Sequence, residues 1–210
     1  MNRVIAYVDR VIAYVDGFNL YFGLRDKGWR RFYWLNIQLL AQNLLKFNQK
    51  LIITKYFTAR VIGSPEKQKR QSTFIEALET LSDFKIFYGK YQPNPRKCPN
   101  CGFKDKVPNE KMTDVNIAVE MLSDAVNDKF DIALLLSADS DLTPSVRAIK
   151  NTFTQKRIIV VFPPKRESVE LSSVAHACLR VGRANLARSL LPDEVEKADG
   201  FILQRPATWK

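Results

Sequence analysis

Carboxylate side chains follow two apolar runs of this chain, at the point where each run ends. Asp16 closes the first run, and Asp139 and Asp141 come directly after the second. A third carboxylate, Asp114, opens the helical stretch that leads into the second run. Several carboxylates held close together cannot all stay ionised without a cation, and Mg²⁺ and Mn²⁺ prefer oxygen ligands. If these side chains meet in the fold, they form a site for a divalent metal.

Each acid also has an ordinary structural interpretation. Asp16 precedes a glycine, as in many turns, and Asp139 or Asp141 could cap the next helix. Asp114 is an acid in a first helical turn, where the helix dipole favours it. The joint placement of these acids at matching strand ends favours the metal site.

The chain around these acids is basic. It contains 33 Lys and Arg residues against 22 Asp and Glu, which gives a net charge of +11. This charge favours a nucleic acid partner, although a basic surface can also serve solubility alone. An acidic pocket on a basic body suits metal-dependent cleavage of a polyanion. The single histidine, His176, excludes a ribonuclease with paired histidines, and no glycine-rich motif for nucleoside triphosphates or dinucleotides is present.

Length and composition indicate one globular cytoplasmic domain. A chain of 210 residues with 46% apolar residues can bury a core. No apolar run approaches the roughly 20 residues that span a membrane, and the start lacks the pattern of a signal peptide. Three cysteines, an odd number, favour a reducing cytoplasm over a disulfide scaffold.

A seven-residue sequence occurs twice at the start of the chain. Residues 3–9 and 10–16 both read Arg-Val-Ile-Ala-Tyr-Val-Asp. Two copies are too few for a repeat architecture, so the first copy is interpreted as a duplication. Only the second copy continues into Gly17-Phe18-Asn19, which makes Asp16 the candidate residue and Asp9 a decoy.

Hydrophobic patterning predicts alternating strands and helices. Strands are expected over residues 11–16, 51–61, 84–91, 131–137, 157–162 and, at an edge, 177–181. Helices are expected over residues 36–47, 65–81, 112–127, 142–151 and 168–175. The expected domain covers residues 10–183, with a long Cys-containing loop at 92–110 and a weakly structured tail at 184–210.

Strands that are apolar throughout and alternate with helices predict a parallel sheet covered on both faces. Ligands of such sheets bind beyond the carboxyl ends of the strands, where the strand order switches. In the order 3-2-1-4-5, the first and fourth strands are neighbours. Asp16 and Asp139 would then lie together.

Three motifs, in order, resemble those of the NYN domain family, which belongs to the PIN-like nucleases. The motifs are Asp16-Gly17-Phe18-Asn19-Leu20, Lys111-Met112-Thr113-Asp114-Val115 and Leu136-Ser137-Ala138-Asp139-Ser140-Asp141-Leu142. The resemblance covers roughly residues 10–180, including the strand at 158–163. It implies an α/β, Rossmann-like PIN-type three-layer fold and metal-dependent ribonuclease activity.

The resemblance also implies roles for individual residues. The implied catalytic residues and ligands of Mg²⁺ or Mn²⁺ are Asp16, Asp114, Asp139 and Asp141. The implied substrate-binding residues are Asn19, Lys111, Thr113 and Ser137. Ala138 departs from the family, which often has glycine there. Many PIN-like enzymes add a glutamate, but Glu120 lies six residues after Asp114 and does not share its helix face.

Cys98-Pro99-Asn100-Cys101 has the spacing of half a zinc site. The remaining ligands could be His176 and Cys178, or a second copy of the loop in a homodimer; otherwise the thiols are free. Cys178 alone is predicted to be a buried core thiol.

Basic and aromatic residues gather in several segments. The basic ones are Lys67, Lys69, Arg70, Arg96, Lys97, Lys104, Lys106, Lys165 and Arg166. They could be a solvated face or a groove that follows phosphates towards the acids. The aromatic residues Trp29, Phe32, Tyr33 and Trp34 are predicted to pack in the core rather than to stack on bases.

The sequence therefore predicts a metal-dependent ribonuclease acting on single-stranded RNA. A non-catalytic RNA-binding or protein-interaction module with the same fold is the alternative. A phosphatase or phosphotransferase is less favoured, because the covalent type needs Asp-x-Asp after the first strand and Asp16 is followed by Gly-Phe-Asn.

Overall fold

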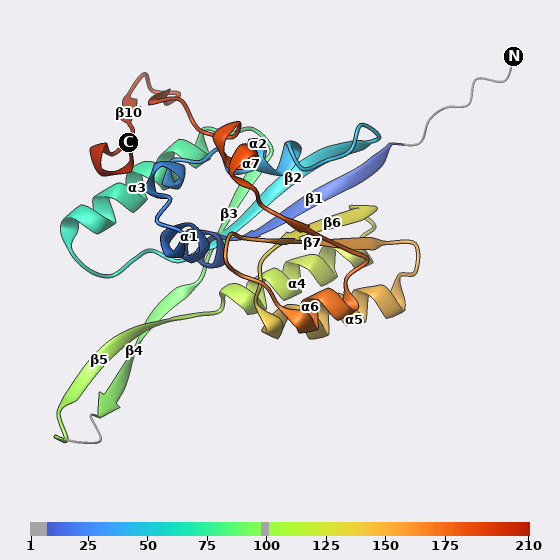
Figure 1. Cartoon of the computed structure of the whole chain (residues 1–210), viewed down its shortest axis with the longest axis horizontal. Helices are drawn as coiled ribbons and strands as arrows, with labels where there is room; N and C mark the ends of the chain where they lie inside the picture. Colours follow the sequence, from blue (N-terminus) through green and yellow to red (C-terminus); the bar gives the residue numbers. More distant parts are fainter. Residues whose placement is uncertain (1–7, 98–100) are drawn as a thin grey trace, which may run out of the picture.

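A computed structural model describes residues 8–97 and 101–210. Its centre is a sheet of six parallel strands (Figure 1). In spatial order these are β3 (Phe84–Tyr88), β2 (Gln49–Thr58), β1 (Asp9–Asp16), β6 (Ile132–Leu136), β7 (Arg157–Phe162) and β8 (Ala177–Arg180). The predicted order is confirmed for the five strands that it covers, and β8 extends the sheet at its edge.

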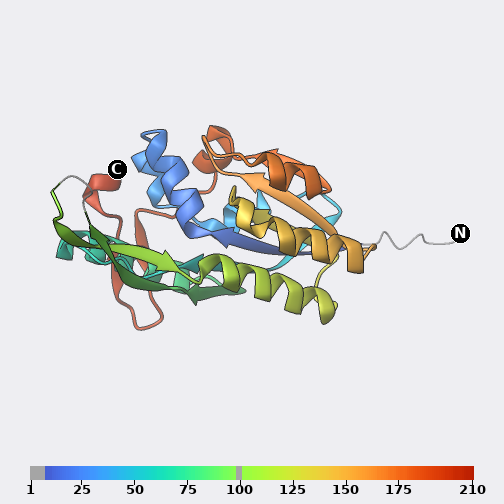
Figure 2. The ribbon, with the colours of Figure 1, turned by 90° about the horizontal axis from the view of Figure 1, so that it is seen from below.

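Helices cover both faces of the sheet, as predicted (Figure 2). One face carries α1 (Gly17–Asp26), α2 (Ile37–Gln42), α3 (Pro65–Glu79) and α7 (Arg183–Ala187). The other face carries α4 (Thr113–Val126), α5 (Thr143–Thr152) and α6 (Val169–Val174). Short 3-10 helices are η1 (Arg30–Tyr33), η2 (Ser140–Leu142) and η3 (Ala207–Trp209).

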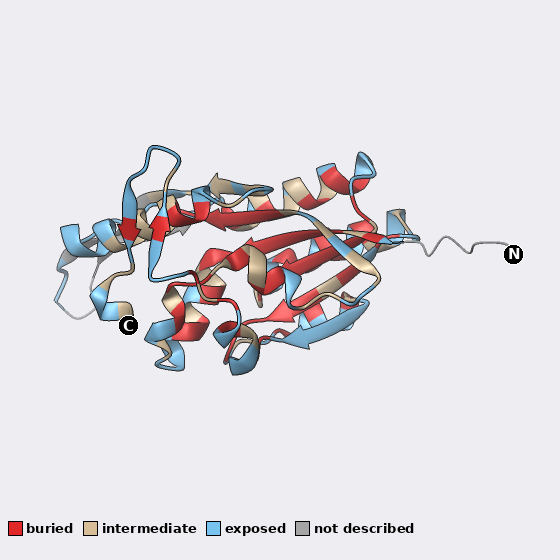
Figure 3. Cartoon of the chain, turned by 90° about the horizontal axis from the view of Figure 1, so that it is seen from above, coloured by how far each residue is buried: buried red, intermediate tan, exposed pale blue. Residues whose placement is uncertain are grey.

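Alternation along β1 divides the core into two layers. Val11, Ala13 and Val15 pack towards α1 and α2, whereas Ile12 and Tyr14 pack towards α4 and α5. All five side chains are buried, and the central strands of the sheet are buried along most of their length (Figure 3). A strand buried on both faces has no polar side to place in water, which explains its nearly uninterrupted apolar sequence.

The prediction of a long loop at 92–110 was wrong. β4 (Lys90–Lys97) and β5 (Lys104–Lys111) pair antiparallel and project from the body as an arm (Figures 1 and 2). A two-stranded ribbon outside the core does not need the apolar alternation by which strands are recognised. The polar composition of this segment therefore concealed its pairing.

The prediction of a weakly structured tail at 184–210 was also wrong. After α7 the chain forms β9 (Glu194–Glu196), β10 (Ile202–Gln204) and η3. Leu191, Val195 and Leu203 are buried with Trp34, whose indole Nε1 donates to the carbonyl oxygen of Pro192 at 2.7 Å. These short elements each contribute one or two core side chains, too few to give a period in the sequence.

Two further boundaries differ from the prediction. The helix expected over 36–47 ends at Gln42, and α1 was not predicted. Among the described residues, no helix is both long enough and apolar enough to cross a bilayer.

Candidate metal centre

Asp16 is fixed at the point where β1 passes into α1. Its Oδ1 accepts the backbone N–H of Asn19 at 2.9 Å, and its Oδ2 accepts the Asn19 side-chain amide at 2.6 Å. The first bond is an N-cap, which satisfies one of the free N–H groups of the first helical turn. The Asp16 side chain is buried, with 2% of the residue exposed.

Ser137 connects Asp16 to the end of β6. Its hydroxyl donates to Asp16 Oδ2 at 2.9 Å and accepts the backbone N–H of Asp139 at 3.1 Å. The backbone N–H of Ala138 donates to Asn19 Oδ1 at 3.4 Å. Because Val15 lies opposite Leu136 in the sheet, the next residue of each strand meets at its carboxyl end. The switch point of strand order therefore holds the first and third motifs together.

Three of the predicted acids form a compact group. Asp114, Asp139 and Asp141 each offer a carboxylate oxygen, and these oxygens lie within 4.8 Å of one another. Asp139 caps η2 by accepting the backbone N–H of Asp141 at 3.0 Å. Metal–oxygen bonds of about 2.0–2.6 Å place two ligands of one ion at most about 5 Å apart. The three carboxylates therefore fit a divalent cation.

Asp16 lies beside this group and, within the described part of the chain, is not a member of it. Burial raises the pKa of Asp16 and the charge of Asp139 raises it further, whereas the bonds from Asn19 and Ser137 lower it. Asp16 is thus coupled electrostatically to the group. Its role as a metal ligand stays a prediction.

The second motif directs Asp114 towards the group. Lys111 ends β5 and is exposed, and Thr113 begins α4 and is buried. Between them Met112 has a φ of 82°, in the left-handed region that residues other than glycine rarely adopt. This turn joins the arm to α4 and places Asp114 in the first helical turn. Substrate binding by Asn19, Lys111, Thr113 and Ser137 stays a prediction.

Glu120 takes part in a separate network between α4 and the strands β1 and β2. Its carboxylate lies 2.6 Å from the ammonium of Lys55, which also forms a salt bridge with buried Asp124. Tyr14 donates its hydroxyl to Asp124 at 2.6 Å. Asp9 lies at the opposite end of β1, where it pairs with Arg157 at 2.6 Å.

The zinc prediction cannot be followed to both cysteines of the pair, because Cys98 lies outside the described residues. Cys178 is exposed, so its prediction as a buried thiol was wrong; it stands on the edge strand β8, whose residues are all exposed. His176 accepts the backbone N–H of Ile158 at its Nδ1, at 3.0 Å. Of the side chains that the structure describes, neither Cys101 nor Cys178 belongs to a group of three candidate metal ligands.

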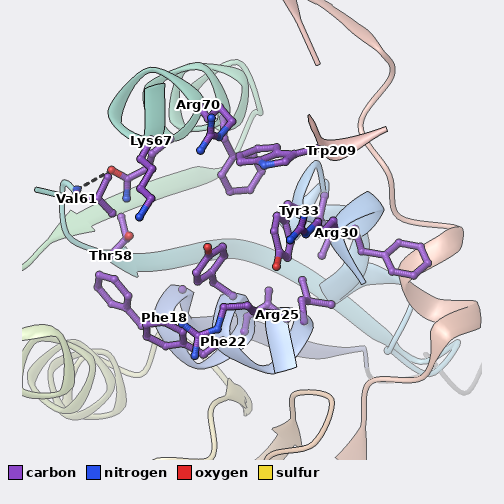
Figure 4. A pocket seen from close by; sticks show the side chains of 18 of the residues that line it. Phe18, Phe22, Arg25, Arg30, Tyr33, Thr58, Val61, Lys67, Arg70 and Trp209 are labelled. Atoms are coloured by element: carbon purple, nitrogen blue, oxygen red, sulfur yellow. Dashed lines mark hydrogen bonds between the residues drawn. The ribbon is translucent and has the colours of Figure 1, made fainter. Parts of the chain in front are cut away.

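A pocket that could not be predicted from the sequence lies beside α1. It has a volume of about 680 Å³ and lies between α1, η1 and α3, with residues of β2 at its floor (Figure 4). Tyr33 and Trp29, which were expected in the core, are only partly buried, and Tyr33 lines the pocket with Arg30. Phe32 and Trp34 are buried as expected, although Phe32 also lines the pocket.

A parallel sheet with carboxylates gathered at its switch point defines a PIN-like α/β domain. The chain belongs to the NYN domain family, which matches residues 10–181. The family predicted from the three motifs is thereby confirmed.

Two individual proteins are similar to this chain. One is 6-hydroxy-3-succinoylpyridine 3-monooxygenase HspA of Pseudomonas putida, which is 29% identical over 92% of this chain and 73% of its own length. The other is a crystal structure of a protein of unknown function, VPA0982, from Vibrio parahaemolyticus. It has a TM-score of 0.55 and 18% identity, and the match covers 88% of this chain and 98% of that one. The second likeness concerns the fold alone.

Proposed function

We propose that this protein is a metal-dependent ribonuclease that hydrolyses phosphodiester bonds of single-stranded RNA. The observation that carries the proposal is the group of Asp114, Asp139 and Asp141, whose oxygens lie within 4.8 Å of one another. Membership of the NYN domain family and the net charge of +11 support it. Together they combine a cation site with a body that attracts a polyanion.

Asp114, Asp139 and Asp141 are the residues that would hold Mg²⁺ or Mn²⁺. When bound, such an ion supplies a nucleophilic water at neutral pH and offsets charge on the phosphate. The chain itself sets the positions of the carboxylates. Ser137 holds the backbone of Asp139 against Asp16, and the N–H of Asp141 holds the Asp139 side chain. Ordered ligands reduce the reorganisation that metal binding and phosphate approach require.

The decisive experiment measures cleavage of end-labelled single-stranded RNA with Mn²⁺, with Mg²⁺ and with EDTA. We expect cleavage only with metal, and a loss of at least about 100-fold in Asp139→Asn and Asp141→Asn, since even residues that merely support a ligand cost 10–100-fold. The matched control is Asp83→Asn, an exposed acid at a positive φ of 50°, which asparagine tolerates. Equal cleavage by the wild type and Asp139→Asn would refute the proposal. RNA binding without any cleavage would indicate the non-catalytic module instead.

A second candidate is oxidation of a small aromatic acid, and the pocket beside α1 is the observation that favours it. The named substrate of the Pseudomonas relative is an aromatic ring with an acidic side chain, and this pocket combines aromatic with basic side chains. Such a reaction inserts one atom of O₂ into the ring and reduces the other to water with two electrons from a supplied reductant. Consumption of O₂ that depends on both an aromatic acid and reduced nicotinamide would support it. If no O₂ is consumed and RNA is cleaved in the presence of metal, the ribonuclease proposal stands.

A further inference from the structure

We infer that the pocket between α1 and α3 binds one nucleotide of single-stranded RNA, with its base against aromatic side chains and its phosphate against basic ones. The choice of RNA as the ligand rests on the proposed function. The volume of about 680 Å³ lies within the range of small-molecule sites. The chemistry of the lining is what identifies the ligand.

The aromatic lining forms two groups, with Phe18 and Phe22 on one side of the pocket and Tyr33 and Trp209 on the other (Figure 4). Tyr21 joins them, with ring centroids 5.4 Å from Phe22 and 5.0 Å from Tyr33. In the first group Phe18 packs against Tyr91, with ring centroids 6.1 Å apart, and against Phe22 at 6.2 Å. In the second group Trp209 lies 5.7 Å from Tyr33 and 6.1 Å from Phe74. All of these side chains are only partly buried. Partly exposed rings that line a pocket offer surfaces on which a base can stack.

Four basic side chains also line this pocket: Arg25, Arg30, Lys67 and Arg70. Among the described residues that line the pocket there is no Asp or Glu. Arg25 pairs with Asp26 at 3.3 Å, but within the described part of the chain Arg30, Lys67 and Arg70 form no ion pair. Basic groups without an acidic partner make the pocket a site for an anion. This lining suits an anion that also carries a flat ring, such as a nucleotide, better than it suits free phosphate.

The pocket and the acidic group share one turn of the chain. Gly17 and Phe18 line the pocket, whereas Asp16 and Asn19 belong to the network beside the acids. Tyr91 also lines the pocket, and the strand paired with its own leads through Met112 into Asp114. A strand whose scissile phosphate lies at the acids can therefore place a neighbouring nucleotide in the pocket.

The lining also accounts for a preference for single strands. In a duplex both faces of each base are covered by neighbouring bases, so an aromatic side chain cannot reach them. Single-stranded RNA presents unstacked bases, and recognition by aromatic and arginine side chains is typical of it.

The test measures binding of a fluorescent oligouridine octamer by anisotropy, in EDTA so that cleavage cannot occur. We expect Tyr33→Leu and Trp209→Leu to weaken binding at least about fivefold, because a leucine keeps apolar bulk without a stacking face. The control is Phe47→Leu, an aromatic residue outside the pocket that is fully exposed. An octamer of abasic ribose-phosphate should bind the wild type as weakly as the intact octamer binds the variants. This arm does not depend on the folding of any variant.

The basic side chains are tested by the salt dependence of binding. Arg30→Ala and Arg70→Ala should each lower the slope of log affinity against log salt by about 0.7, the value expected for one lost phosphate contact in a single strand. The control is Lys69→Ala, which removes an exposed cation from the same helix as Arg70 but outside the pocket. An unchanged slope in both arginine variants would overturn the phosphate contact.

The outcomes separate this inference from the proposed function. Suppose that the leucine variants bind like Phe47→Leu, that the abasic octamer binds as tightly as the intact one, and that Asp139→Asn loses cleavage. The pocket inference is then wrong and the ribonuclease proposal stands. If the leucine variants lose binding but the wild type never cleaves RNA, the pocket binds RNA and the ribonuclease is wrong. If an aromatic acid such as nicotinate binds in the pocket and does not compete with the octamer, the pocket serves a small molecule and the inference is overturned.

Discussion

Ser137 donates its hydroxyl hydrogen to Oδ2 of Asp16 across 2.9 Å, and both residues are buried. The same hydroxyl accepts the backbone N–H of Asp139. One small side chain therefore joins the end of β1, the start of α1 and the loop that presents two of the three clustered acids. This relationship is the structural basis of the first prediction.

Ser137→Ala should reduce both stability and metal-dependent RNA cleavage. The substitution removes a donor from a buried carboxylate and leaves the N–H of Asp139 without its acceptor, a loss of about 1–3 kcal/mol. Thermal unfolding and cleavage with Mn²⁺ measure the two effects. Ser137→Thr, which keeps a hydroxyl, should recover part of both. Ser173→Ala, which removes an exposed hydroxyl that donates to Glu170, is the control. Wild-type cleavage by Ser137→Ala would show that this bond does not position the acids.

Gly17→Ala should destabilise the protein by about 1–3 kcal/mol, the usual cost of overpacking a core. A Cβ at this position would lie 2.6 Å from the Tyr56 hydroxyl oxygen and 2.8 Å from the carbonyl oxygen of Phe57. The backbone of β2 cannot easily move, so α1 must shift and carry Asn19 with it. Urea unfolding measures the loss. Gly182→Ala meets only a side-chain oxygen at 3.3 Å and should change stability less; an equal effect of both substitutions would contradict the argument.

Lys55→Met should destabilise the protein by about 3–5 kcal/mol, because it leaves Asp124 buried without its main cation. Lys55 lowers the pKa of Asp124 against the effect of burial, which raises it. Urea unfolding at neutral pH checks the size of the loss. The double variant Lys55→Met with Asp124→Leu should recover part of it, since no charge then remains at the buried position 124. Lys85→Met, at an exposed position on neighbouring β3, is the matched control. A loss no larger than that of Lys85→Met would mean that water reaches Asp124.

His176 should make stability fall as the pH is lowered from about 7 to 5. Burial lowers the pKa of His176 below its ordinary value near 6.5, and Lys150 and Arg157 lower it further. The unfolded chain therefore binds the proton first, so stability present above pH 6.5 is lost as the pH falls towards the folded pKa. His176→Gln should lack this dependence, and the difference in Tm should be small because His176 is exposed and solvent screens the charges around it. Because the chain has one histidine, parallel Tm curves for the two proteins would exclude the effect.

The sheet could be predicted because its strands are buried on both faces. A buried parallel strand carries an unbroken apolar sequence, and the two strands that end at Asp16 and Leu136 show it most clearly. The order of the strands was an assumption typical of such folds, and the structure confirms it for the five strands concerned. The neighbourhood of Asp16 and Ser137 is a consequence of that order, and the geometry confirms it.

Features that depend on strand pairing or on a few contacts between distant residues could not be predicted from the sequence. The arm formed by β4 and β5 is held by antiparallel pairing, and its sequence carries no apolar alternation that would indicate strands. Trp34 is buried by Leu191 and Leu203, which lie more than 150 positions further along the chain. The division of the aromatic residues near Tyr33 between core and pocket depends on those same contacts. No window of local sequence contains them.

The close contact at Gly17 has a consequence for the duplicated start of the chain. Because residues 3–9 and 10–16 are identical, the central strand could be filled by either copy with the same side chains facing each layer. Within the strand the two alignments place the same residue types at the same positions. They differ only beyond it, where the other alignment would bring Arg10 to the position of Gly17 and Ile12 to that of Asn19. An arginine cannot enter the space against Tyr56, and an isoleucine cannot bond the terminal carboxylate. The absence of a side chain at Gly17 therefore favours the alignment in which residues 10–16 form the strand.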